Sequence, residues 1–359
     1  MRSRAVAICL LGGCRIGFDS AEPVDPFAPS HVGATVGGGR GVLVLGDAVI
    51  DTTTLLINGA PPAAGGTLST APQPGGPELA ILHVDALTIE AGATVRVIGG
   101  RPLVIVADHD IEIVGVLDAG ARADVPGAGG SSPSSGLGAG ADVVPPADNC
   151  DPAGGGGGFA QAGAPGGGIC PDPGIGGPAH GDASIAILVG GSGGGTGAPG
   201  ECAPAPGGGG GGAIQLTAFR EILVATSGAI VVGGGGGAGG PECGMADGGG
   251  GSGGGAGGAI FLEARALQID GSLRADGGGG GAAGNGQPQN GDVSIGQPGF
   301  DASLDGAGAG GISTARLNET AGDGGRGGSP GLAPSAGMDG LNGGGGGGGA
   351  GWIYQRIVE

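Results

Sequence analysis

One short stretch of the chain has the residue types and spacing of a calcium loop. Residues 138–144 are Gly-Ala-Gly-Ala-Asp-Val-Val, which fits the core of a glycine-rich calcium repeat with Asp142 as its carboxylate. A calcium ion takes about six to eight oxygen ligands, so loops of this kind bind it as stacked copies. A single copy is found here. Asp142 is therefore a weak calcium candidate, with calcium at most a stabiliser, and an ordinary acidic loop is the favoured interpretation.

Two further stretches place an imidazole next to carboxylates. Asp108-His109-Asp110, and His180 with Asp182, could orient a group for acid–base catalysis. Both stretches have the composition of turns and loops, where aspartate is common for conformational reasons. The glycine runs lack the Lys-Ser/Thr of a phosphate loop, and no nucleophile motif or zinc signature is present. The sequence therefore predicts a non-catalytic protein. A β-helical polysaccharide lyase or hydrolase is the alternative.

Four cysteines remain once Cys9 and Cys14 are assigned to an export signal. They lie in loops rich in Gly and Pro, and none forms a Cys-x-x-Cys pair, so disulfides are expected rather than a zinc cluster. Three pairings are open for the candidates Cys150, Cys170, Cys202 and Cys243.

Short apolar segments recur along the chain at a regular spacing. From Leu79 onward, apolar pairs step by eight residues, and each pair has the alternation of a short β-strand. The segment that starts at Ala213 is echoed by the one that starts at Ala259, 46 residues later. Residues 352–354 match the first strand of a last unit. A fixed period of this kind indicates that one supersecondary unit is stacked repeatedly.

Three strands per circuit of 24 residues, with an aliphatic inner face, predict an all-β fold, a right-handed parallel β-helix-like solenoid. An antiparallel meander with strands and turns of the same length is the competing interpretation. The predicted division of the chain is coils at 41–119, a Gly/Pro-rich insertion at 120–212 with a short strand at 185–189, and coils alternating with glycine-rich excursions at 213–359.

Glycine makes up 100 of the 359 residues, partly in runs such as 207–212 and 343–349. Ordering a Gly costs about 0.5–1 kcal/mol more than ordering Ala, so the runs stay flexible unless their backbone groups pair. We expect polyproline-II-like excursions stacked on one side of the coils, because only Gly lets backbones approach closely enough. Disordered loops are the alternative.

Composition narrows the choice of partners. The chain has no Lys, and 13 Arg stand against 32 Asp and Glu, for a net charge of -19. Nucleic acid and anionic lipid are therefore poor partners. Aromatic residues make up 2% of the chain, so the core is expected to be thin and aliphatic.

The N-terminus has the order of residues found in an export signal. Arg2 and Arg4 precede the apolar stretch 5–11, which leads into Gly12-Gly13-Cys14. Residues 1–13 are predicted to be a signal peptide and 14–40 a linker. Residues 11–14 resemble the lipobox of bacterial lipoproteins, which implies lipidation of Cys14. We expect membrane attachment only through that lipid, because no other segment reaches the ~18 apolar residues of a membrane span.

Three phrases of the sequence carry a broader resemblance. LVGGSGGG, GGGGGGAIQL and GGGGGGGAGWI, which start at Leu188, Gly207 and Gly343, resemble the uncharacterised glycine-rich surface proteins and lipoproteins of predatory soil bacteria. The glycine runs are also similar in composition to the polyglycine layer of certain phage tail-tip adhesins. The resemblance implies a cell-surface address and no particular activity.

Together these observations predict an exported protein, either a lipoprotein of the cell surface and outer membrane or an extracellular protein. Its expected role is structural or adhesive. A repetitive surface of weak sites would gain avidity for a glycan or cell-envelope surface, or for further copies of the same chain.

Overall fold

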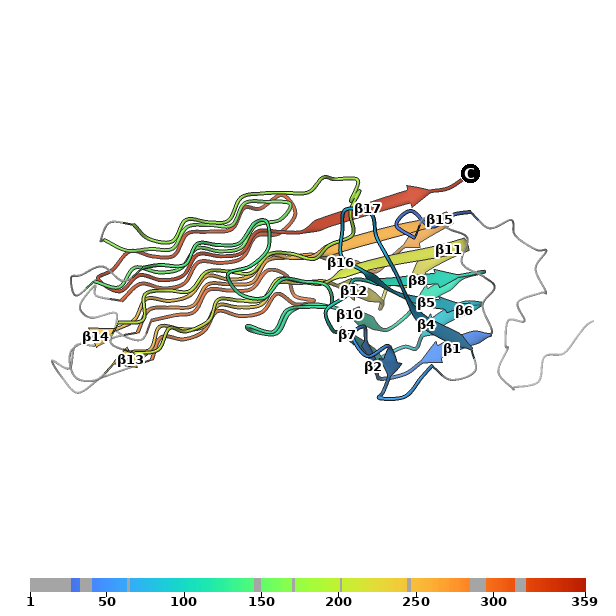
Figure 1. Ribbon diagram of the computed structural model, residues 1–359, viewed down its shortest axis with the longest axis horizontal. Helices are drawn as coiled ribbons and strands as arrows, with labels where there is room; N and C mark the ends of the chain where they lie inside the picture. The colour runs from blue at the N-terminus through green and yellow to red at the C-terminus, as the bar shows by residue number, and fades with distance from the viewer. Residues whose placement is uncertain are drawn as a thin grey trace, which may run out of the picture.

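The computed structural model describes residues 27–32, 41–62, 65–144, 150–169, 172–200, 202–243, 247–284, 295–313 and 321–359. Within these residues all helix-or-strand structure is β-strand. Figure 1 shows two parts, with most of the labelled strands gathered at one end and long wavy segments extending to the other. We call the strand part the β body. The glycine bundle comprises the described residues of 119–212, 232–258 and 275–351.

Two sheets build the β body. The first, sheet A, has nine strands. In spatial order they are β1 (Val42–Leu45), β6 (Ala86–Ile89), β9 (Ile111–Ile113), β11 (Ala213–Val224), β8 (Leu103–Ala107), β5 (Leu79–Val84) and β4 (Gly66–Ala71), with β15 (Ala259–Ile269) paired to β11 and β17 (Trp352–Ile357) paired to β15.

The second, sheet B, has six strands. Their order is β16 (Ser272–Arg274), β12 (Ala229–Val231), β10 (Val116–Asp118), β7 (Thr94–Ile98), β2 (Ala48–Asp51) and β3 (Leu56–Ile57). A separate two-stranded ladder, β13 (Glu242–Cys243) and β14 (Asp247–Gly248), lies at the far end of the glycine bundle (Figure 1).

The predicted right-handed parallel β-helix solenoid is wrong. The two sheets mix parallel with antiparallel pairs, since β4 runs antiparallel to β5 and β3 antiparallel to β2, and they form a half-barrel. Three separate strands per circuit were expected, but β11 crosses two of those positions as one strand with an irregularity between Ala218 and Glu221. Phe219 and Arg220 are not turn formers, so the strand bulges there rather than ending.

The 46-residue repeat does correspond to a pair of neighbouring strands. Strands β11 and β15 are parallel, with Ala213 opposite Ala259 and Ile214 opposite Ile260. Strand β17 extends the same ladder, with Trp352 opposite Ala259. The C-terminal segment is thus a strand of sheet A, in the place that its spacing predicts.

The main core lies between the two sheets and is aliphatic. Ala80 and Leu82 of β5 face this core, whereas Leu79 and Ile81 belong to a second buried cluster on the outer face of sheet A. The sequence pattern pointed to Leu79 and Ile81 as inward-facing. Both sets of side chains are apolar because this part of the sheet is covered on both faces, so alternation alone does not tell them apart.

Segment 185–189, predicted as a strand, is instead a loop over this outer face. Ile185 and Leu188 are buried in the second cluster. The side chain of Gln73 holds the loop, because it accepts from Leu188 N (2.7 Å) and donates to Leu188 O (3.0 Å).

Residues 250–258 form the centre of the glycine bundle. The N–H groups of Gly251, Gly254 and Gly257 all donate to carbonyls of segment 343–349, each at 2.9 Å. Donors that recur every third residue are the pattern of a polyproline-II conformation, which has about three residues per turn. The intervening N–H groups donate to segments 232–238 and 192–198.

The central segment also accepts hydrogen bonds from three further segments, 154–157, 208–211 and 278–281. It is therefore surrounded on all sides by backbone. A Cβ atom on Gly253 would overlap the carbonyl oxygen of Gly155, and one on Gly255 would overlap that of Gly209. The described glycine runs are therefore a hydrogen-bonded bundle rather than unpaired loops.

The predicted signal peptide (1–13) lies outside the described residues, as does the linker (14–40) except for residues 27–32. In the part of the chain that the structure describes, no helix has the length and hydropathy needed to cross a membrane.

Candidate functional site

Asp142 joins two loops of the glycine bundle. Its Oδ1 accepts hydrogen bonds from Thr196 N at 2.8 Å, from Thr196 Oγ1 at 3.0 Å and from the hydroxyl of Ser134. Within the described residues, no group of three or more His, Cys, Asp or Glu side chains could hold a metal ion. The carboxylate thus has a structural task here, and calcium binding stays an untested expectation.

The Asp108-His109-Asp110 turn uses its carboxylates for side-chain pairs. Asp108 Oδ1 lies 2.7 Å from Nε2 of the buried His83, and Asp110 lies 3.4 Å from Arg220. The backbone N–H of His109 donates a hydrogen bond to the carbonyl of Asp85 at 2.8 Å. The sequence singled out this turn but not His83, whose β-strand context indicates only a core position.

His180 has a contact that resembles a nucleophile with its base. Its Nε2 lies 3.0 Å from Ser192 Oγ, and that oxygen also accepts from Gly138 N at 3.0 Å. Burial lowers the pKa of the His180 imidazole, and a hydrogen bond with the Gly158 backbone opposes part of that shift. Ser192 is 1% exposed, so its hydroxyl is closed off from a substrate and the contact is structural.

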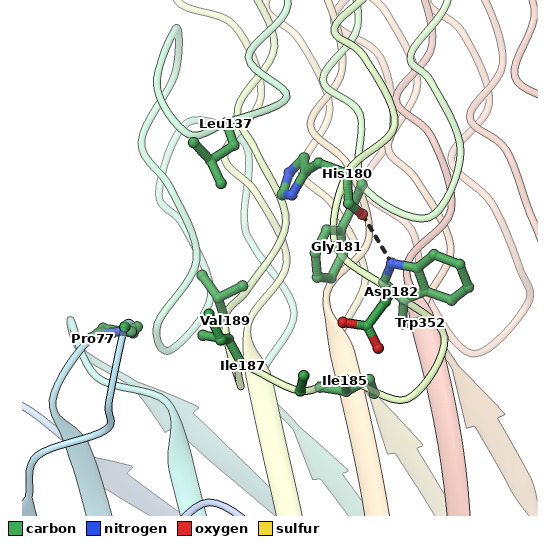
Figure 2. Close-up of a pocket in the computed structure, with 13 residues that line it drawn as sticks. Pro77, Leu137, His180, Gly181, Asp182, Ile185, Ile187, Val189 and Trp352 are labelled. Carbon is green, nitrogen blue, oxygen red and sulfur yellow. Dashed lines mark hydrogen bonds between the residues drawn. The ribbon is translucent and has the colours of Figure 1, made fainter.

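A pocket of about 220 Å³ opens where the glycine bundle meets the β body. Figure 2 shows His180, Gly181, Asp182 and Trp352 on one side of it and Ile187 and Val189 on the other. The lining is mainly apolar: Gly75, Gly76, Pro77, Leu137, Phe159, His180, Gly181, Asp182, Ile185, Ala186, Ile187, Val189 and Trp352. An apolar cavity with a few polar groups is the usual form of a small-ligand site.

Trp352 is fixed at the wall of this pocket by a hydrogen bond. Its Nε1 donates to His180 O at 3.1 Å (Figure 2). Phe159, buried beside it, contacts the His180 ring with a centroid distance of 4.9 Å. Three rings, two from one Gly/Pro-rich segment and one from the last strand, therefore meet at one place.

Asp182 is the acidic group of the pocket. The side-chain hydrogen bond from Ser184 lowers the pKa of the Asp182 carboxyl; some desolvation opposes it, and hydrogen bonds from the Ser184 and Ala186 backbone add smaller contributions that lower the pKa. The bond from Ser184 N is 2.9 Å. The carboxylate is therefore ionised at neutral pH and exposed to accept hydrogen bonds from a ligand.

A second pocket, also of about 220 Å³, adjoins the first. The two share Ile185 and Ala186. The other lining residues are more polar: Ser30, His31, Ser184, Phe261, Tyr354 and Arg356. Both pockets lie against the outer face of sheet A, where Trp352 lines the first and Phe261, Tyr354 and Arg356 line the second.

Most of the aromatic residues of the chain gather on this outer face of sheet A, around the two pockets. The sequence has 6 Phe, 1 Trp and 1 Tyr, which makes eight aromatic residues. Six of these eight belong to the second buried cluster: Phe27, Phe159, Phe219, Phe261, Trp352 and Tyr354. In a chain so poor in rings, this concentration marks the outer face of sheet A as the candidate functional site.

Residues 27–32, which we call the strap, cover part of this face. The strap residue Ser30 donates to the buried Glu263 through its N (2.9 Å) and its Oγ (2.6 Å). Glu263 also accepts from Gln215 Nε2 and Thr217 Oγ1, both at 2.7 Å. Phe27 packs against Phe219 with ring centroids 5.2 Å apart. No feature of the sequence pointed to Glu263 or to the strap.

Cys150 and Cys202 are both disulfide-bonded. Cys14 and Cys170 lie outside the described residues, and the side chain of Cys243 is also outside them. The pairing among Cys150, Cys170, Cys202 and Cys243 and the lipidation of Cys14 therefore stay predictions.

The chain matches no family model, and comparison with curated proteins and with solved structures finds no significant match. The site therefore rests on its own geometry.

Proposed function

We propose that this protein is a non-catalytic adhesive protein of the cell surface, and that it binds a sugar ring in the pocket beside Trp352. The observation that carries the proposal is the position of that indole, which lies in an apolar pocket with the carboxylate of Asp182 at its edge. Export to the surface is the expectation from the N-terminal sequence.

The chemistry of the pocket suits a saccharide. A sugar ring has an apolar face of C–H groups, which packs on an aromatic ring, and an edge of hydroxyl groups, which need acceptors. Trp352 provides the first and the ionised Asp182 the second. Val189 and Ile187 complete an apolar wall opposite (Figure 2).

The glycine bundle supports an adhesive role because it is a rigid support for the pocket. The central segment 250–258 is hydrogen-bonded to its neighbours through the backbone. Leu137, Phe159 and His180, which line the first pocket, belong to this bundle. A preorganised pocket loses little entropy when a ligand binds. This stiffness suits the display of a binding site.

A polysaccharide-cleaving activity is less well supported by this site. Glycosidases use two carboxyl groups about 5–9.5 Å apart. Among the residues that line the first pocket, all in the described part of the chain, Asp182 alone carries a carboxylate. If the protein were such an enzyme, it would release a soluble sugar product, and replacing one acidic residue would abolish that product.

The test is binding of the purified protein to a glycan array, followed by titration of the best glycan. Trp352→Ala and Asp182→Asn should each weaken binding at least tenfold, because each removes one half of the recognition. Ile187→Asp should do the same by placing a charge in the apolar wall. Ile187 is 40% exposed, so this substitution does not disturb the core.

The matched controls are Phe300→Ala and Asp305→Asn, which change the same kinds of side chain at exposed positions of the bundle outside the pocket. They should bind as the unmodified protein does. The proposal is overturned if a folded protein binds no glycan, or if the pocket variants bind as tightly as the controls.

A further inference from the structure

The second pocket lies beside the first and differs from it in charge. The first is lined by apolar residues and one carboxylate, whereas the second contains the guanidinium of Arg356. The chain has 13 Lys and Arg in total and a net charge of -19, so a cation that lines a cavity is notable. A ligand that fills both pockets would meet an apolar ring at one end and a positive charge at the other.

Strand β17 spaces the groups that line the two pockets. Trp352, Tyr354 and Arg356 alternate along it, and residues two apart in a strand point to the same face. Successive members of this row are about 6.6–6.8 Å apart along the strand. The Tyr354 ring also contacts Phe261, with ring centroids 5.3 Å apart. The row thus supplies two rings and then a cation.

Neighbouring side chains hold Arg356 in place but do not occupy all of its N–H donors. Its Nη1 donates to Ser30 Oγ at 2.8 Å and lies 3.7 Å from Glu263 Oε2. Glu263 is fully buried and already accepts the bonds from Ser30, Gln215 and Thr217. A guanidinium has five N–H donors, and the side chain of Arg356 is 48% exposed, so donors remain for a ligand.

We propose that the second pocket takes the carboxylate of an acidic sugar residue further along the same saccharide as the ring that packs on Trp352, so the ligand is a uronate-containing saccharide. This inference rests on the proposed function. Arginine forms paired hydrogen bonds with a carboxylate, and Ser184 and Tyr354 add hydroxyl groups around it. The overall negative charge of the protein repels polyanions at long range, but at physiological salt this repulsion is screened within about 8 Å.

The experiment compares an oligogalacturonate with its methyl ester, which has the same sugar rings without the charges, by calorimetric titration at physiological ionic strength. The unmodified protein should bind the acid at least tenfold more tightly. Arg356→Gln should remove that preference while leaving the affinity for the ester, and Arg356→Lys should keep part of it. Arg326→Gln, the same change outside both pockets, should keep all of it.

Because Arg356 lies beside the buried Glu263, thermal unfolding must show that each variant is folded. The double variant Arg356→Gln/Glu263→Gln removes both charges and should also lose the preference for the acid. A glucuronate oligosaccharide in a third arm shows which uronate fits better.

Equal binding of acid and ester, or a preference for the acid that survives in Arg356→Gln, would overturn this inference. The proposed sugar pocket would still stand if Trp352→Ala weakens the binding of both ligands. Binding of neither ligand, alongside silence on a broad glycan array, would overturn both proposals.

Discussion

The indole Nε1 of Trp352 donates a hydrogen bond of 3.1 Å to the carbonyl oxygen of His180, 172 residues earlier in the chain. The bond ties the last strand of sheet A to a loop of the glycine bundle. It also sets the direction of the ring that lines the pocket, so the shape of the site depends on both parts of the molecule.

Replacing Trp352 with Phe should destabilise the protein by about 1 kcal/mol or more, because the hydrogen bond to His180 is lost and the smaller ring fills less space. Urea unfolding measures the change. Phe300→Leu, at a ring that is 61% exposed, is the control and should have little effect. An unchanged free energy of unfolding in Trp352→Phe would show that the bond contributes nothing.

Gly253→Ala should destabilise the protein by about 3 kcal/mol or more. The added methyl group would overlap the carbonyl oxygen of Gly155, and the surrounding backbone has no side chain that can move aside. At Gly100 the nearest atom to such a methyl group would be Thr53 Oγ1 at 3.8 Å, so Gly100→Ala is a control with ordinary contacts. Thermal unfolding of the two variants, measured in parallel, tests this expectation. Similar unfolding midpoints would contradict the close packing of the bundle.

Asp276→Asn should stabilise the protein at neutral pH. Asp276 is fully buried, and within the described residues neither carboxylate oxygen has a hydrogen-bond partner. Burial raises the pKa of this carboxyl above its usual value of 3.8, while Arg274 lowers it in part. The folded protein therefore binds this proton more tightly than the unfolded chain, so stability falls as pH rises from the unfolded pKa through the folded one.

The gain from Asp276→Asn is expected at pH 7, which lies well above the usual pKa of the carboxyl, so the folded protein bears the cost of the buried charge there. It should shrink below the unfolded pKa, where the carboxyl is neutral in both states. Urea unfolding of both proteins across this pH range is the measurement. A variant that is equally stable or less stable at pH 7 would contradict the assignment of an uncompensated buried charge.

Glu263→Ala should cost about 3 kcal/mol of stability, because it removes the acceptor of the buried Thr217 hydroxyl and one of the two acceptors of Gln215 Nε2, and it releases Ser30 of the strap. Urea unfolding measures the loss. The control is Glu90→Ala, at an exposed glutamate directly after β6 of the same sheet. It should change stability by less than about 0.5 kcal/mol. Equal effects of the two substitutions would mean that the strap contributes little.

Features that are local in the chain were predictable from the sequence. The 46-residue echo between Ala213 and Ala259 predicts their parallel pairing, because a repeated pattern of alternation places equivalent residues opposite each other. The need of the glycine runs for backbone partners also follows from the sequence, since Gly has no side chain to bury. Asp182 and His180 were singled out as a polar loop, but nothing in the sequence placed Trp352 beside them.

The sheet architecture and the site were decided only by tertiary structure. Whether β11 breaks at Phe219 or bulges through it depends on the strands beside it, so the expected three-sided solenoid became two mixed sheets. Leu79 and Ala80 are both apolar, and only the loop 185–189 and the core between the sheets determine which face each covers. The aromatic cluster joins Phe27 to Tyr354, and contacts across such separations depend on how distant segments pack, which composition and spacing do not encode.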